Sequence, residues 1–562
     1  MLIHKTFNRK TLLVFLFLII LIIFLIARLF YLQVFHANVL QKAADRQHNC
    51  VITVPPKRGD IYDTTGKQLA VSIPVSSVYA APRLIDPQKR SVIARELSSI
   101  LNIDVNEIQR KLNKDKMFLW IKRRINEQES TAIAQKKFEG IGLLKEEKRF
   151  YPNGNLASHV LGFVGIDNDG LAGLEMQFDK YLKGAPGWQS VSRDAMGRLI
   201  LDEKSVTVSP ANGFNLILTI DLVIQSIVEK EIESVYNSSR AKSVSIIVMN
   251  PQTGEILALA NRPTYDPNNV GDYNEDTLRN RIVTDCFEPG SVFKIVATSA
   301  ALDLGICKMS DNIYCENGQY AVRKRILHDH TPHGNLSFKD VIAYSSNIGT
   351  VKIALKIGEK ALFNYIKAFG FGRRTGVDLP GERNGFFYDL KNWSHVSITA
   401  LPIGHEISAT GIQVVTAMSV VANGGKLVKP MILKKILTED QKKCIEEKKP
   451  IVVRQVIKKQ TADSIREALS CVVKYGTAKW AALDGYEAGG KTGTAQKLDE
   501  NNQYSHRKFF SSFVGFAPKN SPKIVVGIFI DEPKGRYYGG TVAAPVFKNI
   551  ANSVLRYLEF KE

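Results

Sequence analysis

An unbroken apolar run near the N-terminus constrains this chain more than any other feature. Residues 12–27 read LLVFLFLIILIIFLIA, and the apolar character continues beyond Arg28 to about Phe35. If the Arg28 side chain extends toward the lipid headgroups, residues 11–35 are long enough to cross a bilayer as one helix. The rest of the chain contains no second run of comparable length. The sequence therefore predicts a single membrane-spanning segment.

Basic residues on the N-terminal side of this run indicate its orientation. Lys5, Arg9 and Lys10 precede it, so the positive-inside rule places residues 1–10 in the cytoplasm and the remainder of the chain outside it. A cleaved signal peptide is the alternative. However, the run is longer than the usual apolar part of such a peptide, and no small-x-small cleavage site follows it. The pattern favours a retained signal anchor over residues 11–35.

The composition of the exported body is that of a globular protein. Of 562 residues, 44% are hydrophobic and 23% are charged, which excludes a mostly disordered chain, a collagen-like fibre and a polytopic membrane protein. The formal net charge of +20 either favours an anionic partner or only aids solubility, and export of the body argues against nucleic acid. Six cysteines are too few for a disulfide scaffold, although Cys307 and Cys315 could pair in an oxidising compartment.

Two compositional units follow the anchor. The first, residues 36–238, combines strand-like stretches with a charged helical middle, and Asn237–Arg240 has the composition of a linker. The second, residues 239–562, starts with two strand patterns joined by a turn at Gly254 and closes with a helical pattern over Pro545–Lys561. Between them lie a helix-rich stretch and three further strand patterns, 488–496, 510–516 and 524–530. This order predicts an α/β sandwich around a mostly antiparallel sheet.

The first chemical motif is FEPGSVFK, residues 287–294. Pro-Gly breaks the chain and an apolar helical pattern follows, which places Ser291 at a helix N-terminus. Lys294 lies one turn further on the same face, and in a dry cleft it could lose its proton and act as a base toward the Ser291 hydroxyl. Alone, Ser-x-x-Lys is also compatible with a capping serine and a solvated lysine. Cys286 has no evident base beside it and is predicted to be a small buried side chain.

The second motif is YSSN, residues 344–347. A serine and an asparagine two positions apart can present a hydroxyl and an amide to the same cleft. Ser345 could relay a proton, and Asn347 could hold a substrate amide. An ordinary polar turn is the alternative, because such pairs are common in turns.

The third motif is GGKTGT, residues 489–494, at the start of a strand-like run. Glycine in a strand lets a substrate backbone approach closely, and Lys491 and Thr492 are suited to binding a carboxylate. A Gly-rich β-turn is one alternative. A phosphate-binding loop is another, because residues 485–492 (GYEAGGKT) fit G-x-x-x-x-G-K-[ST]. No apolar strand leads into that string and no helix pattern leads out of it, so the context argues against nucleotide binding.

In this order, the three motifs form the set shared by class A β-lactamases and penicillin-binding proteins. The middle motif lacks the Asp of Ser-Asp-Asn, which argues against a class A β-lactamase. From the anchor to its end the chain resembles a class B penicillin-binding protein, because residues 58–63 (RGDIYD), 149–152 (RFYP) and 170–175 (GLAGLE) are similar to motifs of the class B pedestal. Residues 27–34, 157–175 and 261–269 are most similar to the cell-division type.

The resemblance implies an architecture and an activity. A serine β-lactamase-like α/β transpeptidase domain, with a mostly antiparallel sheet between helices, is expected over residues 239–562. It would follow one transmembrane helix and an elongated mixed α+β pedestal, a non-catalytic, dimerisation-like domain over residues 36–238. The enzyme would crosslink peptidoglycan stem peptides through an acyl-serine with release of D-alanine, in septal wall synthesis, and β-lactams would inhibit it. Elongation-type and sporulation-type transpeptidases are the alternatives.

The resemblance also implies residue roles. Ser291 would be the nucleophile, Lys294 its general base, and Ser345 a proton relay to the leaving D-alanine. Asn347 would position the substrate amide. Substrate binding would involve Lys491, Thr492, Gly493 and Thr494, with the terminal carboxylate on the first two. The backbone N–H groups of Ser291 and Thr494 would form the oxyanion hole. The chemistry needs no cofactor and no metal.

Three competing interpretations fit less well. A β-lactamase needs neither a long pedestal nor a retained anchor. A penicillin sensor needs a cytoplasmic output module, which residues 1–10 cannot provide. The spacing of His328, His330 and His333 could suit zinc or copper, but the segment is expected to be a polar loop.

Partners and location follow from the resemblance as well. Stem peptides ending in D-Ala-D-Ala would be the donors, and β-lactams would be covalent inhibitors. A SEDS-family glycosyltransferase and other division proteins would contact the pedestal, in which Arg58, Asp60 and Glu175 are predicted to form structural ion pairs. The chain would be anchored in the bacterial inner membrane with its catalytic domain in the periplasm.

Overall fold

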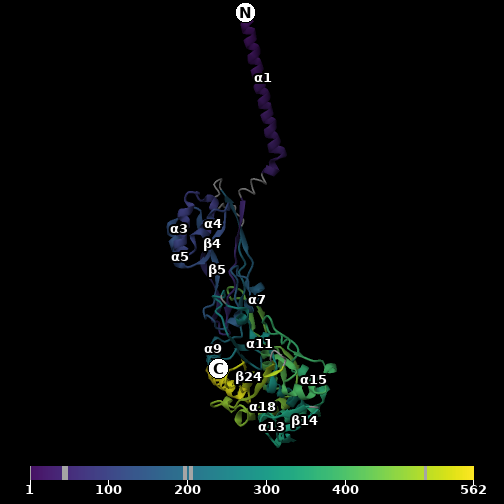
Figure 1. Ribbon diagram of the computed structural model, residues 1–562. Coiled ribbons are helices and arrows are strands. Elements are labelled where there is room, and N and C mark those ends of the chain that lie inside the picture. The colour runs from purple at the N-terminus through teal and green to yellow at the C-terminus, as the bar shows by residue number, and fades with distance from the viewer. Residues whose placement is uncertain are drawn as a thin grey trace. The chain divides into compact units, whose positions relative to one another are not determined.

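The computed structural model describes residues 2–40, 49–193, 199–200, 207–271, 273–323, 325–498 and 503–561. It divides the chain into two compact units (Figure 1). The first contains residues 1–56 and 184–212, and the second contains residues 57–183 and 213–562.

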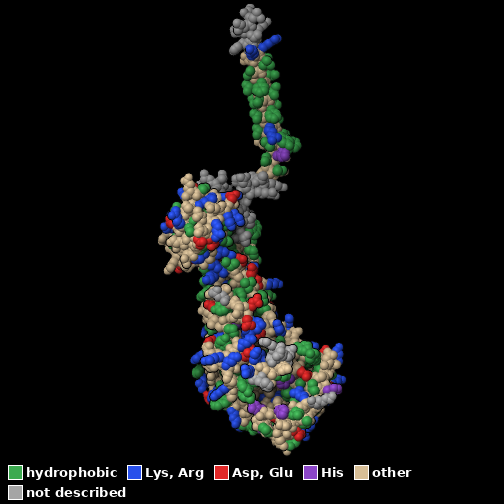
Figure 2. Space-filling view, viewed as in Figure 1, with side chains coloured by type: hydrophobic (Ala, Val, Ile, Leu, Met, Phe, Trp, Pro, Cys, Tyr) green, Lys and Arg blue, Asp and Glu red, His purple; other side chains and the backbone are tan. Residues whose placement is uncertain are grey.

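The first unit contains the predicted anchor. Helix α1 (Leu2–Phe30) continues as the π-helical turn η1 (Tyr31–Phe35), and an 18-residue stretch within residues 9–35 has a mean hydropathy of 3.3. All described side chains from residue 9 to residue 31 are exposed, and Figure 2 shows them as a continuous apolar surface. Transfer of so much apolar surface out of water is strongly favourable. This helix therefore needs an apolar surrounding. In the described part of the chain, this is the one helix long and apolar enough to span a membrane.

A small antiparallel sheet completes the first unit. Strand β6 (Gly187–Arg193) pairs with β1 (Asn49–Val54), β7 (Leu199–Ile200) and β8 (Thr207–Val208). The strand predicted at residues 51–54 is therefore confirmed.

The N-terminal part of the second unit is a mixed sheet with its own helical layer. Seven described strands have the order β21–β20–β9–β2–β3–β4, with β5 also paired to β3. Their bounds are β2 (Ile61–Tyr62), β3 (Gln68–Ala80), β4 (Leu119–Ile125), β5 (Ile141–Phe150), β9 (Asn215–Leu218), β20 (Leu433–Leu437) and β21 (Cys444–Glu447). Helices α3 (Arg90–Leu101), α4 (Val105–Leu112) and α5 (Glu127–Lys136) bury one face each against β3 and β4. Two strands from late in the chain thus extend a sheet that begins in the pedestal sequence.

A buried ion cluster connects the pedestal segments. Glu175 is fully buried and accepts hydrogen bonds from Arg58 Nε at 2.7 Å and from Arg149 Nε at 2.6 Å. Arg58 Nη1 also contacts Asp179 Oδ1 at 2.6 Å. Asp60 lies 3.7 Å from Lys57 Nζ. The predicted structural ion pairs are therefore confirmed, and they join segments more than a hundred residues apart.

Changing Glu175 to glutamine should lower the free energy of unfolding by about 3–5 kcal/mol, because two buried guanidinium groups would lose their shared negative charge. Urea unfolding of the detergent-solubilised chain, followed by intrinsic fluorescence, measures this. The control is Glu139→Gln, which removes an exposed ion pair with Lys89 and should change the free energy by less than about 1 kcal/mol. Equal effects of the two substitutions would show that the cluster is not structurally important.

The C-terminal part of the second unit is built on an antiparallel sheet of five described strands in the order β11–β10–β25–β24–β23. Their bounds are β10 (Ser243–Met249), β11 (Ile256–Arg262), β23 (Gly489–Leu498), β24 (Tyr504–Ala517) and β25 (Ile524–Asp531). All predicted strands of this domain are thus present, and β23 lies at the sheet edge.

Helices cover both faces of this sheet. Phe513 of β24 packs on Phe547 of the closing helix α20 (Ala544–Lys561), with ring centroids 5.0 Å apart. Gly527 faces the other way and leaves room for Val415 of α17 (Gly411–Ala422). Because Gly527 pairs with Val514, the residue next to Phe513, α20 and α17 lie on opposite faces. The predicted sandwich is confirmed.

One prediction about chain organisation is wrong. Residues 237–239, predicted as part of a linker, form the last turn of α9 (Leu222–Ser239), and Arg240 ends the helix in a left-handed conformation. Asn237 and Ser238 are exposed, but Ser239 lies on the buried side of the helix with Val228, Ile232 and Val235. Composition alone did not show that burial, because it depends on the packing of α9 against β11 and α20.

Candidate active site

Ser291 lies at the start of a helix, as predicted. The 3₁₀ turn η3 (Gly290–Phe293) leads directly into α12 (Lys294–Asp303). Gly290 has φ of +55°, in the left-handed region that favours glycine, and the next two side chains after Ser291 are buried in the core. Ser291 itself is half-buried. Its hydroxyl forms no hydrogen bond with any residue that the structure describes, so it is free to meet a ligand.

Strand β23 lies directly against the turn that holds Ser291. A Cβ atom on Gly493 would lie 2.3 Å from Ser512 Oγ, 2.9 Å from Val292 Cγ2 and 3.1 Å from the Pro289 carbonyl oxygen. Any side chain there would push the nucleophile turn away from the strand. The glycine of Lys-Thr-Gly is therefore a spacing residue, as glycine is where two backbones approach closely.

Two buried lysines converge on one serine hydroxyl. Lys294 is 1% exposed and Lys491 is fully buried. The Ser345 Oγ lies 3.1 Å from Lys294 Nζ and 2.8 Å from Lys491 Nζ. Lys294 Nζ also donates to the Ser345 carbonyl at 2.5 Å and to Asn347 Oδ1 at 2.7 Å. Side chains from all three motifs therefore meet at one point.

Burial next to another cation suppresses the charge on these lysines. Loss of solvation lowers the pKa of Lys294 to about 7, and nearby Asp329 partly opposes this shift. Burial and the neighbouring Lys294 lower the pKa of Lys491 well below its usual value. Two ammonium groups that share one hydroxyl in a dry site are unfavourable. A neutral lysine amine is therefore available near neutral pH.

The pKa of Lys294 predicts how acylation depends on pH. If its neutral amine is the base, the rate of Ser291 acylation should rise as pH increases through about 7. Below about pH 6 the rate should fall roughly tenfold per pH unit, because the amine is protonated there. The second-order rate constant for a fluorescent penicillin, measured from pH 5 to 9, tests this. A flat profile across this range would contradict the assignment.

Asp329 is a site residue that the sequence analysis did not identify. Its carboxylate accepts hydrogen bonds from Ser346 Oγ at 2.5 Å, from the Asn347 N–H at 2.6 Å and from the Ile348 N–H at 3.0 Å. It thereby binds the first turn of α14 (Asn347–Ile357), where a negative charge is favourable. The contact spans 17 to 19 residues and forms only because the loop folds back onto the helix start, so no pattern within either segment reveals it.

The histidine-rich loop around Asp329 supports Asn347. The His328 carbonyl accepts a hydrogen bond from Asn347 Nδ2 at 2.9 Å. His330 packs on Tyr538 with ring centroids 4.9 Å apart, and His333 packs on Tyr344 at 5.0 Å. Among the described residues, no group of three His, Cys, Asp or Glu side chains is arranged to hold a metal ion.

Asp329→Asn should reduce the acylation rate about tenfold, because it weakens charge-assisted hydrogen bonds that position Asn347. It should also move the acid inflection of the pH profile below 7, since Asp329 raises the pKa of Lys294. The same penicillin titration measures both effects. Asp311→Asn is the control, because among the described residues this carboxylate accepts a hydrogen bond only from the Lys308 N–H. A reduced rate with an unmoved inflection would assign Asp329 a purely structural role.

The remaining predicted substrate residues lie on β23. Thr492 Oγ1 lies 3.0 Å from Thr477 Oγ1, and Thr494 Oγ1 accepts from the Gly539 N–H at 3.1 Å. A Cβ on Gly290 would lie 3.5 Å from the Thr494 carbonyl oxygen, so the backbones that carry Ser291 and Thr494 are in contact. Lys491 and Thr492 lie inside a strand that continues to Leu498, which is not the loop-to-helix geometry of a phosphate-binding loop.

The structure corrects the interpretation of the cysteines. Cys286 is exposed on β12 (Cys286–Phe287), not buried as predicted. This strand has only two residues, and the side chain of Cys286 faces away from the core while Phe287 packs inward on Phe510. Cys307 and Cys315 are both buried free thiols.

Three features define a serine acyltransferase of the β-lactamase-like fold. They are a half-buried serine at a helix N-terminus, a buried lysine one turn later and a second lysine on an edge strand. The described sheet order and its covering helices fit this class.

Comparisons with known proteins agree. Residues 244–552 match the penicillin binding protein transpeptidase domain, and residues 53–218 match the penicillin-binding protein dimerisation domain. Stage V sporulation protein D of Bacillus subtilis is 35% identical over 99% of this chain and 87% of its own length. Peptidoglycan D,D-transpeptidase FtsI of Escherichia coli is 32% identical over 96% of this chain and 90% of its own length. The crystal structure of penicillin binding protein 3 from Mycobacterium tuberculosis, complexed with aztreonam, has a TM-score of 0.71 at 28% identity, covering 90% of this chain and 97% of that one. This chain belongs to the class B penicillin-binding proteins.

Proposed function

We propose that this chain is a membrane-anchored peptidoglycan D,D-transpeptidase that uses Ser291 as its nucleophile. The observation that carries the proposal is the meeting of Lys294, Ser345 and Lys491 at one hydroxyl, beside a serine whose own hydroxyl has no hydrogen-bond partner among the described residues. Neutral Lys294 accepts the Ser291 proton as Oγ attacks the carbonyl carbon of the D-Ala–D-Ala bond. The C–N bond then breaks, and D-alanine leaves with a proton delivered through Ser345.

The second half of the reaction regenerates the serine. An amine from a neighbouring stem peptide attacks the acyl-serine ester, the new amide forms, and Ser291 recovers its proton. Lys491 and Thr492 bind the donor carboxylate, and Asn347 holds the donor amide. The N–H groups of Ser291 and Thr494 stabilise the oxyanion, whose charge develops only during the reaction.

Septal wall synthesis during cell division is the role that we infer. Relatives named FtsI and PenA are D,D-transpeptidases and support it. The B. subtilis relative carries a sporulation name and matches almost the whole chain, so a sporulation role is the second candidate. Depletion in the native cell distinguishes them, because filamentation supports a septal role, whereas normal division with defective spores supports the other.

We also infer the location, the domain division and a partner. Residues 1–10 are cytoplasmic, residues 11–35 cross the inner membrane, residues 36–238 form the pedestal, and residues 239–562 form the periplasmic transpeptidase domain. A SEDS-family glycosyltransferase and other division proteins contact the pedestal. Co-purification from detergent after crosslinking tests this, and failure to recover any such polymerase contradicts it.

The activity is tested with the full chain in detergent and stem peptides ending in D-Ala-D-Ala. We expect released D-alanine and a crosslinked peptide dimer, and both should disappear after penicillin treatment. Fast hydrolysis of penicillin without peptide crosslinking would instead indicate a β-lactamase.

A further inference from the structure

Tyr344 is an exposed aromatic residue directly beside the hydroxyl at which the three motifs meet. Helix α13 (Phe338–Ala343) ends just before it, and α14 begins at Asn347. Between the two helices, Ser345 has φ of +58°, in the left-handed region, where a residue other than glycine is strained. This tight turn directs the Ser345 Oγ toward the two lysines, while the Tyr344 side chain stays 40% exposed. Adjacent residues therefore carry the relay hydroxyl and an exposed ring.

The Tyr344 ring is in contact with two further rings. Its centroid lies 5.0 Å from that of His333 and 5.9 Å from that of Tyr475. Both neighbours are half-buried, and the Tyr475 hydroxyl donates to Asp340 Oδ1 at 2.7 Å. We call His333, Tyr344 and Tyr475 the aromatic platform. Its rings are supported from below, and none of them has a role in the acylation step.

The turn after Tyr475 connects the platform to one end of the catalytic cleft. The Thr477 N–H donates to the Ala343 carbonyl at 3.2 Å, and Thr477 Oγ1 lies 3.0 Å from Thr492 Oγ1. A Cβ atom on Gly476 would lie 2.2 Å from the Ala343 carbonyl oxygen, so the two backbones are in close contact. The platform therefore lies at the end of the cleft where the proposed reaction places the terminal D-alanine of the donor.

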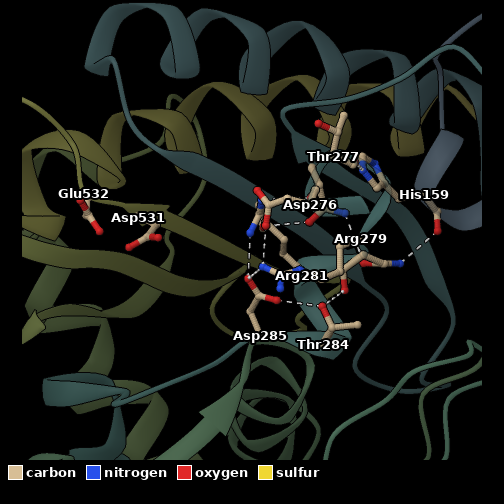
Figure 3. A network of polar contacts seen from close by, with 12 residues as sticks. His159, Asp276, Thr277, Arg279, Arg281, Thr284, Asp285, Asp531 and Glu532 are labelled. Carbon is tan, nitrogen blue, oxygen red and sulfur yellow. Dashed lines mark hydrogen bonds and ion pairs between the residues drawn. The ribbon is translucent and has the colours of Figure 1, made fainter. Parts of the chain in front are cut away.

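The other end of the cleft takes the rest of the donor. In the proposed reaction the donor carboxylate lies at Thr492 and the oxyanion at Thr494. Beyond Thr494, β23 leads into a cavity of about 790 Å³, which residues 495–497 line. In its wall, Arg281 contacts Asp276 at 2.6 Å and Asp285 at 3.0 Å (Figure 3). No ring of the platform lines this cavity, so the two surfaces are separate.

The chemistry of the second half-reaction indicates which surface the acceptor uses. The acyl-serine forms when the C–N bond breaks and D-alanine leaves with a proton from Ser345. Attack by the acceptor is this step in reverse with a different amine, so the new C–N bond forms on the side from which D-alanine left. The neutral amine gives one proton to the Ser345 relay. The ester C–O bond then breaks, and Ser291 Oγ recovers a proton.

We propose that the aromatic platform binds the acceptor stem peptide and that Tyr344 is a positioning residue for its amine. The acceptor is a primary amine on an aliphatic side chain, as in a diamino acid. Its methylene groups pack on the Tyr344 ring, which places the nitrogen beside Ser345. Water cannot make this contact, so the ring favours aminolysis of the acyl-serine over hydrolysis. The inference rests on the proposed function, because it takes the position of D-alanine from the role of Thr492.

Partition of the acyl-enzyme between an amine and water tests the proposal. The donor is Nα,Nε-diacetyl-L-Lys-D-Ala-D-Ala, which has no free amine. The acceptors are N-acetyl-L-Ala-γ-D-Glu-X-D-Ala peptides in which X is L-lysine or meso-diaminopimelate, and the better of the two is used. Mass spectrometry separates the crosslinked product from the hydrolysed donor. Tyr344→Ala should lower the ratio of crosslinked to hydrolysed product about fivefold, as expected for the loss of one ring contact.

Two further readings separate positioning of the acceptor from a structural role. The acceptor concentration that gives half of the maximal ratio should rise in Tyr344→Ala protein. The rate of penicillin acylation should not share the fall in the ratio, because acylation precedes acceptor binding. Tyr344→Phe keeps the ring and should keep the ratio of the unmodified chain. His333→Ala removes only a supporting ring and should lower the ratio about twofold.

Tyr273→Ala is the matched control. Tyr273 is a 38% exposed tyrosine that packs on Tyr265 with ring centroids 6.0 Å apart, outside the platform. An unchanged ratio in Tyr344→Ala protein would overturn the proposal, as would an equal fall in the ratio and in penicillin acylation. Absence of D-alanine release and of crosslinked product from the unmodified chain would instead contradict the proposed function. The two failures are therefore distinguishable.

Discussion

Replacing Ser291 with alanine should abolish covalent labelling by penicillin. The hydroxyl oxygen is the atom that would form the ester, and neither Lys294 nor Ser345 can replace it at that position. Removal of a catalytic serine typically lowers the rate by about 10⁴-fold or more. Fluorescent-penicillin labelling of the detergent-solubilised chain, with mass spectrometry of the labelled peptide, measures the loss.

The fold should survive this substitution. Because the Ser291 hydroxyl has no hydrogen-bond partner among the described residues, its removal should change the free energy of unfolding by no more than about 0.5 kcal/mol. Ser238→Ala on α9, far from the motifs in sequence, is the control and should keep full labelling. A stable adduct in Ser291→Ala protein would show that another residue is the nucleophile.

Lys294→Met should have the second-largest effect, a loss of about 10³-fold in the acylation rate, within the range found for general bases. Methionine keeps most of the buried volume but removes the amine. The Ser345 carbonyl and Asn347 Oδ1 would lose their donor, so some destabilisation is also expected. Rapid-quench labelling measures the rate, and a thermal melt measures the stability.

The pH profile separates a base from a merely structural lysine. In Lys294→Met protein the residual acylation should lose its inflection near pH 7. If the inflection persists, Lys491 is the base instead. Lys352→Met, which removes a half-buried lysine paired with Glu316 in the same helical region, is the control and should keep both the rate and the inflection.

Much of the fold was predictable because its signals are local. The apolar run specifies a membrane helix from its length, and the strands at β10, β11 and β25 are short apolar segments bounded by turns. The nucleophile motif also carries its own structure, since Pro-Gly ends one segment and the apolar pattern after Ser291 begins a helix.

The errors concern positions where long-range packing decides the outcome. Residues 237–239 are helical because α9 packs on β11 and α20, which the polar sequence does not show. Cys286 is exposed because of the direction in which a two-residue strand presents its side chain. Strands β20 and β21 join a sheet begun far earlier in the chain, and Asp329 contacts a helix start that lies in another segment.

By itself, the sequence determined the anchor, the antiparallel α/β architecture, the three motifs and the family resemblance, since each depends on side-chain patterns within short segments. The tertiary structure alone decided that Lys294 and Lys491 share the Ser345 hydroxyl, that Gly493 accommodates the nucleophile turn, and that β23 leads from the site into a charged cavity. The physical reason is that desolvation, charge repulsion and steric contact act through space. They depend on distances between atoms that lie 51 residues apart in the chain for Lys294 and Ser345 and 146 apart for Ser345 and Lys491, and no local pattern contains those distances.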